Sequence, residues 1–143
     1  MENYQNILVV IDPTTNEQKA LNRAIDLASK INNCNEDHSK VKVSAFLCVF
    51  DFSYEMTTIL SSDERDVMRQ SVIKDKEFWL ENFIRELDSD IEIDCQVVWH
   101  NRPFEAIIEQ VIEQNYDLVI KSTHQHDKFK SVIFTPTDWH ILR

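Results

Sequence analysis

The fold is decided by the stretch Ile7-Leu8-Val9-Val10-Ile11, five consecutive apolar residues near the start of the chain. A run this short and this rich in β-branched side chains is typical of a strand that is covered on both faces, as the strands of parallel sheets are. Asp12 and Pro13 follow it directly, and the proline ends the strand because it cannot donate to a sheet. We therefore expect a buried central strand at residues 7–11.

Working outward, short apolar runs alternate with longer amphipathic segments. One long helix begins with the capping-box pattern from Ser61 to Glu64, and its apolar stripe includes Val67 and Phe78. Pro103 suits the first turn of the next helix. The strands expected are 7–11, 41–50, 91–99 and 117–121, and the helices are 16–31, 61–88 and a segment beginning at 103. This order predicts an α/β fold, an open parallel sheet with helices on both faces.

The last part of the chain fits this pattern less well. A polar loop at 122–130 follows the fourth strand, residues 132–134 are apolar with no obvious partner, and a helix is expected from about Pro136. A fold of this kind would normally add one more strand. We therefore expect residues 1–143 to be a single domain and a truncated piece of a longer protein, ending before its final strand.

The chain of 143 residues contains no glycine. Glycine-rich phosphate loops and the Gly-x-Ser-x-Gly elbow of hydrolases are therefore excluded. Turns with positive φ must use Asn or Asp, the next most tolerant residues.

The formal net charge of −10 disfavours binding to nucleic acid and to anionic membrane surfaces, so neither is expected as a partner. The N-terminus has no signal-peptide pattern, and we expect a cytoplasmic protein. The three cysteines are widely spaced. Cys48 and Cys95 lie in apolar runs and are expected to be buried thiols with no redox role.

Ligands of open α/β sheets bind beyond the carboxyl ends of the strands. Asp12 and Pro13, the segment after Phe50 and the loop at 122–130 should therefore converge on one cleft. His124 and His126 in that loop are weak candidates for zinc ligands. The favoured interpretation is that the segment is a solvated polar loop. A serine hydrolase site is not supported, because nothing presents a hydroxyl beside an oxyanion hole, and no catalytic residue is expected.

Three stretches resemble the universal stress protein family over nearly the whole chain: 7–12, 102–108 and 116–120. Residues 51–58 and 134–140 are similar to the first half of members that carry two such domains in tandem, which implies that residues 1–143 are the N-terminal half of a tandem protein. Asn101 falls where the family often has glycine, so the resemblance implies a turn with positive φ there. The resemblance implies a bacterial stress-response protein with a five-stranded parallel sheet that pairs with a second domain of the same chain or with another copy. It also implies a role in resistance to DNA-damaging agents.

Family members that bind nucleotide carry a Gly-x-x-Gly pattern, then nine residues and a third glycine before Ser or Thr. Those positions fall on Ser122, Gln125, Thr135 and Pro136, so all three glycines are absent. Asp12 matches the residue that hydrogen-bonds the nucleoside in binding members. The resemblance therefore implies a degenerate nucleotide site that holds no ATP, and no cofactor is expected.

Three functions remain open at this point. The favoured one is a noncatalytic regulatory or interaction module. The alternative is a nucleotide-binding or weakly ATP-hydrolysing domain that uses Asp12 and the 122–136 loop, with His124, His126 and Arg102 neutralising phosphate. In the third, the cleft between the first and fourth strands holds a small apolar or acidic ligand.

Overall fold

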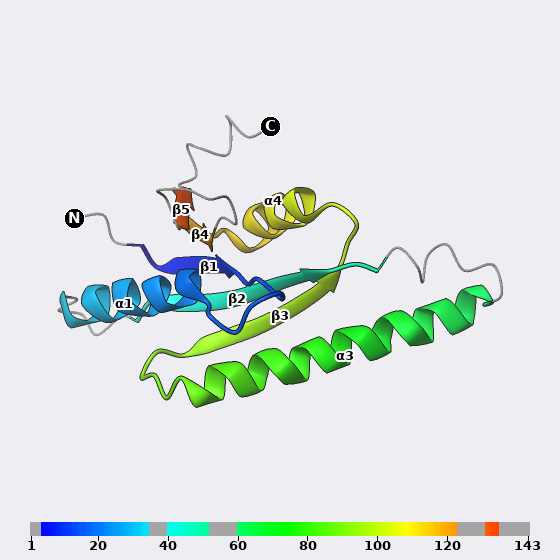
Figure 1. Ribbon diagram of the computed structural model, residues 1–143. Helices are drawn as coiled ribbons and strands as arrows, with labels where there is room; N and C mark the ends of the chain where they lie inside the picture. The colour runs from blue at the N-terminus through cyan, green and yellow to red at the C-terminus, as the bar shows by residue number, and fades with distance from the viewer. Residues whose placement is uncertain (1–3, 35–39, 52–59, 123–130, 135–143) are drawn as a thin grey trace.

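The computed structural model describes residues 4–34, 40–51, 60–122 and 131–134. Helices and strands alternate along the chain as the sequence predicts (Figure 1). The elements are β1 (Asn6–Val10), α1 (Lys19–Cys34), β2 (Lys42–Val49), α3 (Ser62–Glu86), β3 (Ile93–Trp99), α4 (Pro103–Gln114), β4 (Leu118–Ser122) and β5 (Ser131–Phe134).

The strands form one sheet in the order β3-β2-β1-β4-β5, with β1 at its centre. The first four strands are parallel, which confirms the predicted open parallel sheet. The fifth strand was not predicted: β5 pairs with β4 in the antiparallel direction, Ile133 opposite Ile120. The apolar run at 132–134 thus has a partner in this sheet, and the helix expected from Pro136 lies outside the described residues.

Helices cover both faces of the sheet (Figure 1). Alternate residues of β1 separate the two layers: Ile7 and Val9 pack with α1 and α3, and Leu8 packs with α4. Both sets are fully buried, which explains why the run that sets the fold is apolar without interruption. Trp79 and Trp99 are partly buried and pack against the layer of α1 and α3.

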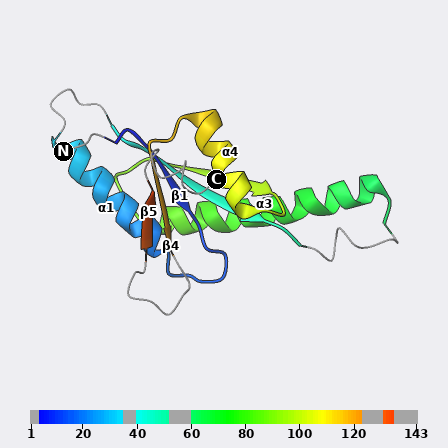
Figure 2. The same cartoon turned by 90° about the horizontal axis from the view of Figure 1, so that it is seen from above.

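The helix α3 begins with the capping box that the sequence predicts. The Ser61 side chain accepts a hydrogen bond from the Glu64 amide, and the Glu64 carboxylate accepts one from the Ser61 amide. Its buried contact is concentrated in the second half, where Leu80 has no exposed surface. The first half extends past the carboxyl ends of β2 and β3 (Figures 1 and 2).

The predicted stripe on α3 is wrong at two positions, because Val67 and Phe78 are each 69% exposed. A helix of 25 residues is about 37 Å long, whereas β2 with 8 residues spans only about 26 Å. Val67 therefore lies beyond the sheet. Phe78 precedes Leu80 by two residues, about 200° around the helix, and so points away from the sheet.

The carboxylate of Asp117 joins the beginnings of β1 and β4. It accepts hydrogen bonds from the backbone N–H of Gln5 at 2.9 Å and of Asn6 at 3.1 Å. The Asn6 side chain in turn donates to the carbonyl oxygen of Gln114 at 2.9 Å. The central strand is therefore fixed to β4 by side chains as well as by the sheet ladder.

Positive φ values occur at Asp88 (48°) and Asn115 (54°), the residue types expected where glycine is lacking. The prediction for Asn101 is wrong, since Asn101 has no positive φ. The turn there is closed by a side chain instead: the backbone N–H of Arg102 donates to Nδ1 of His100 at 2.9 Å.

The thiols of Cys48 and Cys95 are half-buried and pack against the two core layers, close to the prediction of buried thiols. Burial raises the pKa of Cys95 to about 11, with a further contribution from the carboxylates of Glu81, Asp94 and Glu77. The Cys95 thiol of the folded chain therefore keeps its proton at pH values where the same thiol of the unfolded chain has lost it.

We expect the free energy of unfolding to fall as the pH rises from 9 towards 11, because Cys95 stabilises the folded state fully only below its unfolded pKa. Urea unfolding at a series of pH values measures this slope. Cys95→Ala should make the decline shallower, and Cys34→Ala, which removes an exposed thiol, should leave it unchanged. Equal slopes in the wild type and Cys95→Ala would contradict the assignment.

Candidate functional site

A cleft lies at the carboxyl ends of β1 and β4, beside the first turn of α4. Its volume is about 320 Å³, and we call it the carboxyl-edge cleft. Its lining consists of Val10, Ile11, Asp12, Pro13, Thr14, Cys48, Pro103, Ile107, Lys121 and Ser122. The predicted convergence is thus confirmed for Asp12, Pro13 and the end of β4. The residues at 52–59 and 123–130, which complete that prediction, lie outside the described ranges.

The side chain of Gln18, a residue that is only 3% exposed, holds the Asp12 loop in place by hydrogen bonds. The Gln18 side chain accepts a hydrogen bond from the Asp12 N–H at 3.0 Å and donates to the carbonyl oxygens of Asp12 at 2.6 Å and Thr15 at 2.8 Å. These bonds also explain why α1 begins at Lys19 rather than near Asn16: residues 12–18 form a compact turn first.

The carboxylate of Asp12 is engaged within its own loop. Its Oδ1 accepts hydrogen bonds from the backbone N–H of Thr14 at 2.9 Å and from the Thr14 hydroxyl at 2.6 Å. This turn is the local structure that Asp favours where it hydrogen-bonds the chain two residues on. The arrangement fixes a negative charge at one end of the cleft.

Lys121 is the one basic side chain among the described residues that line the cleft. It is paired with Val10 in the sheet register, and its ammonium nitrogen lies 4.4 Å from the centroid of the Phe104 ring. Sequence reasoning missed this residue. The available signal was a lysine directly after the apolar Leu118-Val119-Ile120 run, at the strand end where ligands of such sheets bind.

The segment between β3 and α4 contacts Cys48, which lines the cleft. The Cys48 thiol donates to the carbonyl oxygen of His100 at 3.3 Å, and burial raises the pKa of Cys48 above its usual value. Arg102 forms an exposed ion pair with Glu105 at 2.8 Å, and this contact raises the pKa of Arg102. Neither the His100 nor the Arg102 side chain lines the cleft.

The predicted site residues divide into two groups. Asp12 and Ser122 line the carboxyl-edge cleft together. The others lie outside the described residues: Gln125, Thr135, Pro136, His124 and His126. Among the residues that the structure describes, no three His, Cys, Asp or Glu side chains are grouped closely enough to hold a metal ion.

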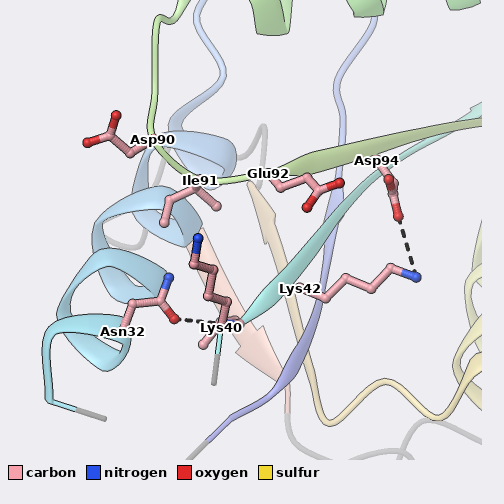
Figure 3. Close-up of a pocket in the computed structure, with 8 residues that line it drawn as sticks. Asn32, Lys40, Lys42, Asp90, Ile91, Glu92 and Asp94 are labelled. Atoms are coloured by element: carbon pink, nitrogen blue, oxygen red, sulfur yellow. Dashed lines mark hydrogen bonds and ion pairs between the residues drawn. The ribbon is translucent and has the colours of Figure 1, made fainter. Parts of the chain in front are cut away.

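A second pocket of about 380 Å³ lies at the opposite edge of the sheet, where β2 and β3 begin (Figure 3). Lys42 pairs there with Asp94 at 3.4 Å, and the Asn32 side chain accepts a hydrogen bond from the Val41 N–H at 2.8 Å. The carboxylates of Asp90, Glu92 and Asp94 point in different directions in Figure 3. They do not converge on one point, so the carboxyl-edge cleft remains the better candidate site.

Comparison with known proteins agrees with this architecture. The model of the Universal stress protein family matches residues 3–143. The chain belongs to the universal stress protein family. The resemblance predicted from the sequence is therefore confirmed, and the family accounts for the parallel sheet and for the position of Asp12 at the end of its central strand.

Several curated relatives are similar over the whole chain. It is 52% identical to universal stress protein E of Escherichia coli K12 over 144 aligned residues, and 41% identical to a universal stress protein E homolog of Haemophilus influenzae over 141. The chain spans only 43% and 44% of the length of these two relatives. Proteins about twice as long as this chain fit the tandem organisation that the sequence predicts.

Solved structures of the family share the fold. Universal stress protein UspA from Lactobacillus plantarum superposes with a TM-score of 0.63 at 16% identity, covering 99% of this chain and 92% of its own. A family member from Burkholderia pseudomallei gives 0.52 at 17% identity, covering 87% and 85%. None of the helices in the described ranges combines the length and apolar composition that a membrane span requires.

Proposed function

We propose that this chain is a noncatalytic regulatory module of the cellular stress response, whose cleft holds no ATP. The observation that carries the proposal is the absence of glycine at all three positions of the family's phosphate-binding pattern, now Ser122, Gln125 and Thr135. Glycine allows backbone N–H groups to approach phosphate oxygens with no Cβ between them. Pro136, where binding members have Ser or Thr, has neither an N–H nor a hydroxyl to donate.

The cleft supports the same proposal. Its volume of about 320 Å³ is at the lower end of the range for small-molecule pockets. The Asp12 carboxylate, which would receive the nucleoside, already accepts two hydrogen bonds from Thr14. Among the described residues that line the cleft, Lys121 is the one basic side chain that would face several phosphate charges, and the Asp12 carboxylate lines the same cleft.

The partner in this proposal is a second universal stress protein domain, either in the same chain or in another copy. Relatives that are about twice as long support the first arrangement. By resemblance, the proposal also includes a cytoplasmic location and a role in resistance to DNA-damaging agents.

We expect ATP to leave the melting temperature of the chain unchanged at millimolar concentration. A ligand present at 100 times its dissociation constant stabilises a protein by about 2.7 kcal/mol, a readily measured shift. Calorimetric titration of wild type and Asp12→Ala with ATP provides the second readout, and both should give no binding heat. Micromolar affinity in the wild type that is lost in Asp12→Ala would overturn the proposal in favour of the nucleotide-binding alternative.

That alternative receives less support from the described residues. It needs Arg102 to neutralise phosphate, and the Arg102 guanidinium is already paired with Glu105 outside the cleft lining. Asp12 at the end of β1 is the one feature that favours it.

A further inference from the structure

Lys121 is a charged group in largely apolar surroundings. The cleft around it is walled by the side chains of Val10, Ile11, Pro13, Cys48, Pro103 and Ile107. The Lys121 side chain is only partly exposed, and its ammonium group faces the Phe104 ring. Within the part of the chain that the structure describes, Lys121 forms no ion pair with a carboxylate. An ammonium group beside apolar side chains is stabilised by an anion, and among the described residues no carboxylate forms an ion pair with it.

The charges in the cleft also restrict the anion. Of the described residues that line it, Asp12 is the acidic one and Lys121 the basic one. An anion with several charges would meet repulsion from Asp12, whereas a single carboxylate can contact Lys121 alone. The rest of the lining is suited to a short aliphatic group, because burial of apolar surface contributes about 0.8 kcal/mol for each CH₂.

We propose that the carboxyl-edge cleft binds a small monocarboxylate with a short aliphatic tail. The carboxylate forms an ion pair with the ammonium group of Lys121, and the tail packs against Val10, Pro103 and Ile107. This proposal rests on the proposed function, since it gives a cleft without nucleotide a ligand of its own. It makes the module a sensor of short-chain organic acids.

Cys48 provides a reporter of occupancy, because it lines the same cleft. Its raised pKa slows alkylation, so modification by iodoacetamide can be followed in time by peptide mass spectrometry. The exposed Cys34 is an internal standard in the same sample. A ligand in the cleft should slow alkylation of Cys48 and leave that of Cys34 unchanged.

The test compares butyrate with butyramide, which has the same size and no charge, and with the dicarboxylate succinate. We expect butyrate to raise the melting temperature and to protect Cys48 from alkylation. Butyramide and succinate should do neither at equal concentration.

Lys121→Met should weaken butyrate binding about tenfold or more, because a charged hydrogen bond is lost, and Lys121→Arg should retain the binding. Lys42→Met, which removes a lysine at the opposite edge of the sheet, is the matched control and should bind as the wild type does.

Equal effects of butyrate and butyramide, or no effect of butyrate, would overturn the inference, and this comparison needs no variant. ATP included in the same panel separates the two proposals. Stabilisation by butyrate alone supports both. If neither ligand stabilises the protein, the monocarboxylate proposal is wrong and the proposed function is unaffected. If ATP stabilises the protein, the proposed function is wrong.

Discussion

Replacing Leu80 with alanine is expected to lower the free energy of unfolding by about 2–5 kcal/mol. Leu80 is the buried residue of α3 and has no exposed surface. Its loss removes apolar contact and leaves a cavity between α3 and the sheet, so the second half of the helix is held less firmly. Urea unfolding gives the magnitude, and hydrogen exchange of α3 amides should accelerate more than that of the β1 amides.

The same helix provides the control. Val67→Ala removes an aliphatic side chain that is 69% exposed, and it should change stability by no more than about 0.5 kcal/mol. If Val67→Ala proved as destabilising as Leu80→Ala, the first half of α3 would have to be packed in solution, contrary to the structure.

Replacing Gln18 with alanine is expected to cost about 2–4 kcal/mol and to loosen the Asp12 loop. Three hydrogen bonds disappear, and the Asp12 N–H and the carbonyl oxygens of Asp12 and Thr15 lose their partner. A buried polar group without a partner costs about 1–3 kcal/mol, although water reaching the partly buried loop recovers part of this. Chemical denaturation measures the loss.

Two further variants sharpen this test. Gln18→Glu keeps an acceptor for the Asp12 N–H but places negative charge against two carbonyl oxygens, so it should be at least as unstable as Gln18→Ala at neutral pH. Gln70→Ala removes an exposed glutamine from α3 and should be neutral to within about 0.5 kcal/mol. Wild-type stability in Gln18→Ala would mean that the loop is held by other contacts.

The sequence predicted well what depends on neighbours along the chain. The capping box at Ser61 and the proline at the start of α4 are local signals, and both helices begin where these residues place them. The burial of β1 on both faces could also be predicted from its uninterrupted apolar run, because a central strand with helices on both sides exposes neither face.

Features that depend on distant partners were missed. β5 is a strand of four residues whose pairing with β4 no short-range pattern indicates. Lys121 gains its importance only from the register that sets it beside Val10 and from the Phe104 ring on another element. The turn at Asn101 was missed for another reason: it is closed by a local contact between the His100 ring and the Arg102 N–H, which residue preferences for positive φ do not contain.

The position of β1 at the centre of the sheet has a consequence for biosynthesis. Asn6 is bonded to Asp117, 111 residues later in the chain. A ribosome adding about 5–20 residues per second needs roughly 5–20 s to produce that partner after the first strand has been made. During this interval the apolar strand β1 can pair with β2 but not yet with β4. Chaperones that shield exposed strands should therefore engage β1 early and release it once β4 emerges.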